Sequence, residues 1–369
     1  MANNNNTKNL NVPNLRFPEF KGEWEKCKLE ECVVFLDGKR KPIKSSERVS
    51  EQKLYPYYGA SGIIDYIDDY LFDGKFILLS EDGANILDRN YRVAFIAEGK
   101  IWVNNHAHVL QSNDNIDINF IAEKLESLDY SIYNTGTTMP KLNQEVCRNI
   151  PLWLPPTEEQ VKIGTLLSLL NERITTQSKI IEKYESLIKG IRYYILEEST
   201  HYNYLGNLCD IIKGQQVNLD NLLKHGRYYV MNGGTQPSGY YNSYNTNAGT
   251  ISISEGGNSC GYVQYNKENF WSGGHCYTLQ NIKGELTEKY LYHYLKSNEK
   301  MIMALRVGSG LPNIQKKDLM SLRIPIPAKE NQKKISCLLD SIEDKISVET
   351  NVMTKFMQQK QYLLANLFI

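Results

Sequence analysis

A short basic segment is the first place where side-chain types and spacing suggest chemistry. Four cationic side chains fall within six positions, directly after an Asp-Gly pair that predicts a turn: Lys39, Arg40, Lys41 and Lys44. Four like charges cannot be buried together in a core, because each unpaired charge loses its hydration. The segment is therefore either a solvated loop or a loop that contacts phosphate groups, and we predict the second.

Two histidines occupy matching positions in the two halves of the chain, His106 and His275. The spacing His106-x-His108 is compatible with a metal ion, because alternate residues of a strand face the same way. However, the second half has Tyr277 in place of His108, and no third ligand is apparent. We therefore expect no metal site, and histidines that are hydrogen-bonded or face a ligand.

Motifs for catalysis or cofactor binding are missing from the sequence. It contains no GxxxxGK[ST] phosphate loop and no Gly-rich strand–helix junction for a nucleotide. Its one double proline, Pro155-Pro156, lacks the acidic or amide residue and the aromatic residue of the [DN]PP[YF] tetrapeptide of amino-methyltransferases. We expect this chain to hold no cofactor and to supply no chemistry of its own.

Composition places the chain among ordinary globular proteins. It has 369 residues, enough for two or three domains, with 41% hydrophobic and 23% charged residues and no net charge. No apolar run is long enough to span a membrane, and the polar start lacks the core of a signal peptide, so we expect a cytoplasmic protein. The seven cysteines are scattered and indicate neither disulfides nor zinc. Residues 1–12 are Asn-rich and are predicted to be disordered.

Two long helices are predicted to position everything else. Over 157–198 and again over 329–369, apolar residues recur every three and four positions, from Gln160 and from Gln332. Such a repeat gives each helix a narrow apolar seam that only another helix can cover, and the simplest partner is the other copy. Symmetric packing requires the helices to run antiparallel. Gln177 and Glu349, the one polar residue in the middle of each seam, would then lie near the dyad and could fix the register.

The regions before the helices, 13–156 and 199–328, share landmarks in one order. Ser80-Glu81-Asp82-Gly83 matches 254–257, and Gly136-Thr137-Thr138-Met139-Pro140 matches 308–312. Predicted short helices at 116–128 and 288–297 also correspond. The first region is further predicted to contain apolar strand-like segments around 75–80, 92–97 and 101–103. At Thr157 and Gln160 we predict a capping box that opens the first long helix. Each region plus its helix is therefore one copy of a duplicated unit.

A globular domain that ends in a G-[ST]-x-x-P-x-[LI] loop and is followed by a [EN]-Q-x-x-I helix, all occurring twice, resembles the specificity subunits of Type I restriction–modification systems. The resemblance covers about 13–369. It implies a mixed α/β fold, with two similar target-recognition domains joined by two long helices in an antiparallel coiled coil with a pseudo-two-fold repeat. It also implies that each domain reads one half of a bipartite site in double-stranded DNA.

The resemblance further implies protein partners. These are two methyltransferase subunits and, through them, restriction subunits, with S-adenosylmethionine, ATP and Mg²⁺ bound by the partners. The chain itself would be a non-catalytic subunit.

Side chains that bond base edges or phosphates are chiefly Arg, Lys, Asn, Gln, Ser and Thr on exposed turns. In the first domain, the candidates for DNA binding are Lys39, Arg40, Lys41, Lys44, Asn104, Asn105, His106, Thr137, Thr138 and Lys141. In the second domain, they are Lys213, Gln215, Gln216, Asn232, Gln236, Asn258, His275, Ser309, Asn313, Lys316 and Lys317.

Three other functions remain open from the residues alone. One is a stand-alone regulator that binds a split DNA site without enzyme partners. A second is a hydrolase with duplicated sites, which pairs His106 with Glu81 and His275 with Glu255, although no nucleophile accompanies them. The third is a structural scaffold, which the neutral net charge would permit.

Overall fold

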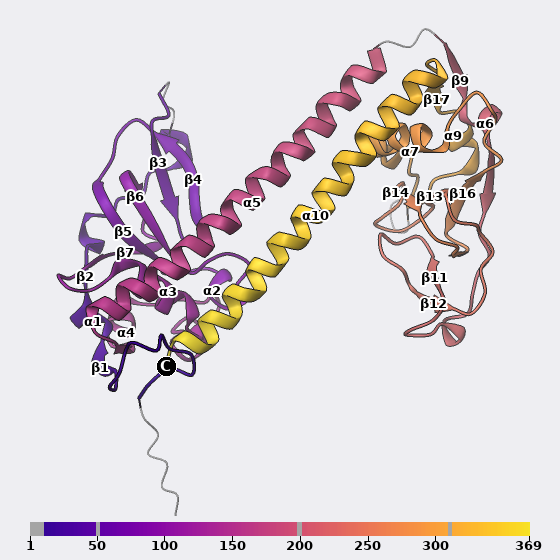
Figure 1. Cartoon of the computed structure of the whole chain (residues 1–369). Coiled ribbons are helices and arrows are strands. Elements are labelled where there is room, and N and C mark those ends of the chain that lie inside the picture. Colours follow the sequence, from indigo (N-terminus) through magenta and orange to yellow (C-terminus); the bar gives the residue numbers. More distant parts are fainter. Residues whose placement is uncertain (1–10, 49–51, 198–200, 309–311) are drawn as a thin grey trace, which may run out of the picture. The chain divides into compact units, whose positions relative to one another are not determined.

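The computed structural model describes residues 11–48, 52–197, 201–308 and 312–369 (Figure 1). They form two compact units: unit 1 comprises Met1–Ser178 with Val352–Ile369, and unit 2 comprises Lys179–Asn351. Of the segment predicted to be disordered, 1–10 lies outside the described residues. Asn11 is placed, and its carbonyl oxygen accepts a hydrogen bond from the Trp24 amide (2.8 Å).

Unit 1 is built on a six-stranded sheet with the order β2-β7-β5-β6-β3-β4. Its strands are β2 Val33–Phe35, β3 Tyr55–Gly59, β4 Gly62–Ile67, β5 Phe72–Ser80, β6 Ala94–Val103 and β7 Ala107–Ser112. A separate pair consists of β1 Glu25–Lys28 and β8 Pro151–Leu154. The two segments predicted at 92–97 and 101–103 are thus one strand, and β3 and β4 were not predicted.

One helix covers the sheet of unit 1 and closes its core. This is α3, Ile118–Ser127, which lies within the predicted helix at 116–128 and buries Phe120, Ile121 and Leu125 completely. The Asp117 carboxylate caps it by accepting a hydrogen bond from the Phe120 amide (2.8 Å). The short elements of unit 1 are α1 Leu29–Cys32, α2 Asn85–Asp88, α4 Gln144–Arg148, η1 Asp37–Lys39, η2 Ser45–Glu47 and η3 Tyr130–Ile132.

Unit 2 repeats this topology with one interruption. Its four-stranded sheet has the order β10-β16-β13-β14, and its three-stranded sheet has the order β12-β11-β15. The strands are β9 Tyr202–Tyr204, β10 Asp210–Lys213, β11 Tyr228–Met231, β12 Gly239–Tyr241, β13 Thr250–Ser254, β14 Val263–Asn266, β15 Trp271–Ser272, β16 Cys276–Gln280 and β17 Arg323–Pro325. The helices are α6 Leu205–Leu208, α7 Glu288–Ser297, α8 Glu299–Ala304, α9 Lys316–Met320 and η4 Leu219–Asn221.

The two units match strand by strand. The order β2-β7-β5-β6 corresponds to β10-β16-β13-β14, and the parallel pair β3·β6 corresponds to β11·β15. The continuous strand β6 of unit 1 is split in unit 2 into β14 and β15, which divides one sheet into two. The pair β1·β8 corresponds to β9·β17. The predicted internal repeat is therefore confirmed, and α7 has the predicted bounds.

The long helices are α5, Thr157–Glu197, and α10, Lys329–Leu367. In unit 1, the seam at the start of α5 packs against the end of α10: Ile163 and Leu167 share a core cluster with Leu363 and Leu367. In unit 2, the end of α5 packs against the start of α10, where Ile188 meets Leu339 and Ile342. The helices therefore pair antiparallel within each unit, as predicted.

The two polar residues in the middle of the seams are both at least partly buried. Gln177 is 8% exposed, and Glu349 is half-buried. They belong to different units, Gln177 to unit 1 and Glu349 to unit 2. Their role as a register-fixing polar layer stays a prediction.

The predicted capping box at the start of α5 is wrong. The buried Gln160 side chain does not reach back to Thr157. Its Nε2 donates to Pro155 O (2.8 Å), and its Oε1 accepts from the Asp117 amide (3.1 Å). Gln332 does the same for α10 by bonding Pro327 O and the Thr287 amide. Each glutamine therefore ties a long helix to the start of the helix that covers its sheet.

Candidate nucleic-acid interface

Loops from distant parts of the chain meet at one edge of unit 1. We define loop edge 1 as residues 37–44, 59–64, 81–83, 104–106 and 135–141. Backbone hydrogen bonds join these segments: the Glu81 amide donates to His106 O (2.9 Å), and the Gly83 amide donates to Pro140 O (3.0 Å). The Lys41 amide donates to Val103 O (3.3 Å), which ties the basic segment to the end of β6. The predicted basic segment, histidine turn and Gly-Thr-Thr loop thus lie together.

The same bonds recur in unit 2, where loop edge 2 comprises residues 213–216, 232–238, 255–258, 273–275 and 312–313. The Glu255 amide donates to His275 O (2.9 Å), the Gly257 amide to Pro312 O (3.0 Å), and the Gln215 amide to Ser272 O. Ser309, predicted to contact DNA, lies outside the described residues.

Two further pairs of bonds complete the correspondence between the loop edges. The Leu142 amide donates to Glu81 O (2.7 Å), and the Ile314 amide donates to Glu255 O (2.9 Å). The Asn104 amide donates to Tyr58 O (3.0 Å), as the Gly273 amide does to Met231 O (2.8 Å). Five backbone bonds therefore build one loop arrangement twice.

Glycines permit this close approach of the loops. A Cβ at Gly136 would lie 1.8 Å from Met139 O, so the loop that contains Thr137 and Thr138 can turn only with glycine there. A Cβ at Gly214 would lie 2.2 Å from Gly273 O, where two segments of loop edge 2 touch. Glycine is required at both positions because the neighbouring backbone is too close to leave room for a Cβ atom.

Glu81 is the charged centre of loop edge 1. Its carboxylate accepts a hydrogen bond from Arg40 Nη1 (2.7 Å) and lies 3.4 Å from Lys141 Nζ. Arg40 also donates to Ala107 O (2.7 Å), and its side chain is only 13% exposed. Arg40 therefore holds the loops together, and its guanidinium is not available to DNA in this arrangement.

His108 lies beneath this centre, buried, with Nδ1 2.6 Å from the Asp37 carboxylate and Nε2 2.8 Å from Leu142 O. Burial alone lowers the pKa of His108, but the bonds to Asp37 and Cys147 outweigh it and raise the pKa to about 10. The pKa of Asp37 is lowered: burial opposes this, but the imidazolium dominates. The prediction that His106 and His108 point the same way is wrong, because His106 Nδ1 faces Asp82 (2.8 Å).

Three lysines of loop edge 1 remain free of these networks. Lys39, Lys41 and Lys44 are exposed, and none of the described acidic side chains forms an ion pair with them. The remaining polar candidates of unit 1 divide by burial. Asn105, Thr137 and Thr138 are exposed, whereas Asn104 is buried and its Oδ1 accepts a hydrogen bond from the His106 amide (2.8 Å). Asn104 thus shapes the turn.

Loop edge 2 has fewer cations and more exposed amides. Lys213 Nζ is bonded to Glu255 (2.6 Å), which also accepts from the Tyr277 hydroxyl (3.0 Å). Asn232 Oδ1 accepts from the His275 amide (3.1 Å), which repeats the role of Asn104. The exposed amide side chains are Gln215, Gln216, Gln236, Asn258 and Asn313. The exposed Lys316 and Lys317 begin α9 and lie outside loop edge 2.

Comparison with known proteins agrees with this duplicated architecture. The model of the Type I restriction modification DNA specificity domain matches the chain twice, over residues 21–185 and 201–355. The chain belongs to this family. A putative type I restriction enzyme specificity subunit of Haemophilus influenzae is 27% identical over 368 residues, covering 92% of each chain. A type I restriction enzyme specificity subunit of Methanocaldococcus jannaschii is 22% identical and covers 95% of this chain and 92% of its own.

A solved structure supports the fold. The crystal structure of a Type I restriction–modification system S subunit from M. genitalium superposes with a TM-score of 0.78 at 18% identity, covering 97% of this chain and 99% of that one. Among the described residues of the specificity chain, no helix is long and apolar enough to cross a membrane.

Among the described residues, the two loop edges do not share the His–Glu pair that a duplicated hydrolase would use. His106 is bonded to Asp82 rather than to Glu81, and His275 Nδ1 lies 3.6 Å from Glu255. The nearby serine hydroxyls are also engaged, since Ser80 Oγ donates to Ala60 O (2.6 Å) and Ser254 Oγ donates to Gly233 O. The predicted recurrence of one His–Glu pair in both domains is therefore wrong.

Outside the loop edges, the described residues contain one group with metal-ligand composition: His293, Asp340 and Glu343 in unit 2. His293 Nε2 lies 3.0 Å from Asp340 Oδ1, but its Nδ1 is the atom that faces Glu343 (3.6 Å). The imidazole thus lies between the two carboxylates. The group joins α7 to α10.

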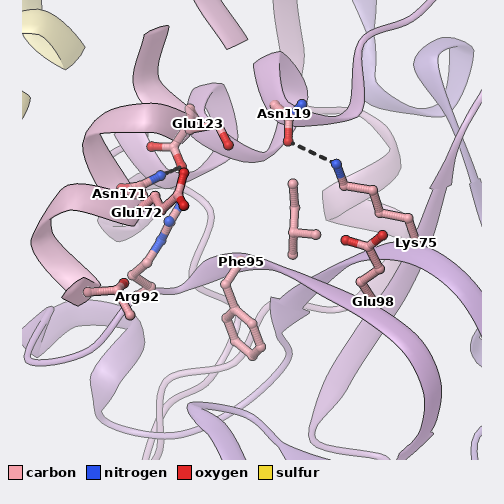
Figure 2. A pocket seen from close by; sticks show the side chains of 11 residues that line it. Lys75, Arg92, Phe95, Glu98, Asn119, Glu123, Asn171 and Glu172 are labelled. Atoms are coloured by element: carbon pink, nitrogen blue, oxygen red, sulfur yellow. Dashed lines mark hydrogen bonds and ion pairs between the residues drawn. The ribbon is translucent and has the colours of Figure 1, made fainter. Parts of the chain in front are cut away.

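A pocket of about 370 Å³ lies in unit 1 among β5, β6, α3 and α5 (Figure 2). Glu123 is bonded there to Arg92 and to Asn171 Nδ2, and Lys75 donates to Asn119 Oδ1 (3.3 Å). None of its lining residues belongs to loop edge 1. Three carboxylates among them disfavour phosphate binding.

Sequence reasoning missed one segment of loop edge 1, the tip of the β3–β4 hairpin at 59–64. The Ser80 hydroxyl fastens this tip to the end of β5 through Ala60 O. A signal was present, because Gly59-Ala60-Ser61-Gly62 is a glycine-bounded turn between apolar segments.

Proposed function

We propose that the chain is the DNA sequence-recognition subunit of a Type I restriction–modification complex, and that each loop edge contacts one half of a bipartite site. The observation that carries the proposal is that five backbone bonds build the same loop arrangement twice while the exposed side chains differ. A shared scaffold with different exposed residues is what two readers of different sequences require.

The exposed side chains of the two loop edges suit them to different kinds of contact with DNA. Lys39, Lys41 and Lys44 on loop edge 1 are suited to phosphates, which give affinity without sequence information. On loop edge 2, amide side chains such as Gln215, Gln236 and Asn313 are suited to base edges, because an amide bonds adenine through two atoms in the major groove. The predicted contacts of Asn105, Thr137 and Thr138 with DNA complete the proposal for unit 1.

We further propose that α5 and α10 act as a spacer, so that the two recognised blocks are separated by a fixed unspecified gap. A helix of this length spans on the order of 60 Å. Gln177 and Glu349 would form the polar layer that fixes the register of the pair, at a cost in stability.

The proposed partners are two methyltransferase subunits, which dock on this chain, and restriction subunits, which bind through them. Methyl transfer and cleavage would be carried out by those partners with S-adenosylmethionine, ATP and Mg²⁺, and this chain would be non-catalytic. Because its ligand would be the DNA of the cell or of an invader, its place of action would be the cytoplasm.

The test is to co-express the chain with a methyltransferase subunit of a Type I system and to sequence the host DNA for methylated adenine. We expect a stable complex and methylation confined to two short sequence blocks at a constant separation. Methylation at a single undivided block would contradict the bipartite proposal. Specific DNA binding by the isolated chain, with no complex formed, would instead indicate a stand-alone regulator.

A further inference from the structure

The missed tip of the β3–β4 hairpin is the apolar part of loop edge 1. Two consecutive isoleucines, Ile63 and Ile64, are 47% and 53% exposed there. β4 is the last strand of the six-stranded sheet, so the tip is covered by no further strand. Single exposed apolar residues are common on protein surfaces, but these two are consecutive and belong to the proposed DNA-contacting edge.

A β-bulge at Ile64 interrupts the regular pairing of the hairpin beside its tip. In the β3·β4 pairing, Tyr58 faces Ile63 and Tyr57 faces Asp65, so Ile64 has no partner residue across the ladder. Bulges redirect a side chain and are frequent beside functional sites. A Cβ at Gly59 would lie 3.2 Å from Ile64 Cγ2 and 3.5 Å from Asn104 Nδ2. The Ile64 side chain therefore lies against the same backbone as the turn that presents Asn105 and His106.

Unit 2 has a polar tip at the equivalent position. The equivalence is fixed by the serine bonds, because Ser80 Oγ donates to Ala60 O and Ser254 Oγ donates to Gly233 O. After Gly233 the tip of unit 2 runs Gly234-Thr235-Gln236-Pro237-Ser238, with an exposed amide at Gln236. The hairpin tip is thus apolar in one domain and polar in the other.

Base pairs present one apolar group in the major groove, the 5-methyl of thymine, and apolar side chains contact it. We infer that Ile64 contacts a thymine methyl group in the half-site read by unit 1. The inference rests on the proposed function, since it assumes that loop edge 1 faces DNA. It adds that this domain discriminates one A·T pair by shape and apolar contact, without a hydrogen bond from Ile64.

Deoxyuridine tests the inference, because it differs from thymidine only by that methyl group. Each thymine of the recognised blocks would be replaced in turn by deoxyuridine in a synthetic duplex. Binding to the complete complex with its methyltransferase subunits would be measured by fluorescence anisotropy. At one position we expect the affinity to fall about fourfold, the ratio that follows from burying one methyl group.

Matched variants separate contact from folding. Ile64→Ala should bind the thymine and deoxyuridine duplexes equally at that position. Leu54→Ala, which shortens a similarly exposed apolar residue of unit 1 outside loop edge 1, should keep the fourfold preference. Equal binding of thymine and deoxyuridine by the wild-type complex at every position would overturn the inference and leave the proposed function intact. If that complex showed no sequence-specific binding, the result would instead contradict the proposed function itself.

Discussion

The three free lysines of loop edge 1 give the sharpest quantitative prediction. We expect Lys39→Ala, Lys41→Ala and Lys44→Ala, combined in one variant, to weaken DNA binding at all sequences and to flatten its salt dependence. Each lysine is exposed and has no acidic partner among the described residues, so each can neutralise a phosphate without first breaking an ion pair. Every phosphate contact contributes about 0.9 to the slope of log K against log salt.

The magnitude follows from that slope. If all three lysines contact phosphates, the slope should fall by about 2.7, and at 0.1 M salt the affinity should drop about eightfold per contact, or roughly 500-fold in total. The assay is anisotropy on target and random duplexes from about 0.05 to 0.3 M salt. Lys21, Lys26 and Lys100, exposed residues of unit 1 outside loop edge 1, provide a triple-alanine control. An unchanged slope, or an equal loss in the control, would refute the reasoning.

Three further predictions concern the spacer and the buried networks. Inserting seven residues into both α5 and α10 should lengthen the unspecified gap by up to about three base pairs, since seven helical residues rise about 10 Å; methylation sequencing would report it, and altered blocks would contradict it. His108 has a pKa of about 10 in the fold, above its unfolded value of about 6.5, so its contribution to stability is complete below pH 6.5 and is lost towards pH 10. The stability of the wild type relative to His108→Gln should therefore decrease over that range by up to about 5 kcal/mol in urea titrations, and an increase would mean a neutral imidazole. Gln332→Leu leaves three partly buried backbone groups unpaired and should destabilise unit 2 by up to about 3 kcal/mol. Gln160→Leu leaves two unpaired, one of them fully buried, and should cost unit 1 up to about 2 kcal/mol. Fluorotryptophan NMR would follow the unfolding of each unit separately, because Trp271 is the one tryptophan of unit 2. Equal destabilisation of both units would contradict the argument from the number of lost hydrogen bonds.

Features with a local period could be predicted from the sequence. The seam residues of α5 and α10 repeat every three or four positions, and each described seam residue is buried or half-buried. The duplicated landmarks were also visible, because Pro140 and Pro312 occupy the same place in their loops and accept the same bond. The seams can be recognised from residues that are close in the sequence, and the landmarks can be recognised by aligning one half of the sequence with the other.

Features that depend on distant partners could not be predicted. The four cations of the basic segment look alike in the sequence. Arg40 differs from Lys39 and Lys41 only because the fold brings Glu81, 41 residues away, within hydrogen-bonding distance of its guanidinium. The spacing of Thr157 and Gln160 fits a capping box, but Asp117 competes for the glutamine through the packing of α3. The β3–β4 hairpin was missed because its strands are short and its pairing with β6 crosses more than 40 residues.

Position 360 shows how the two copies of the repeat differ along the helix seam. In unit 1, the Lys360 ammonium lies 3.1 Å from Glu123 and donates to Asn171, whereas the matching seam position in unit 2 is Ile188. Two copies of the first half, joined as a homodimer, would place Ile188 beside Glu123 and deprive that carboxylate of its lysine. The two halves are therefore not interchangeable at this position, because Glu123 of the first half is paired with a lysine that lies in the second half.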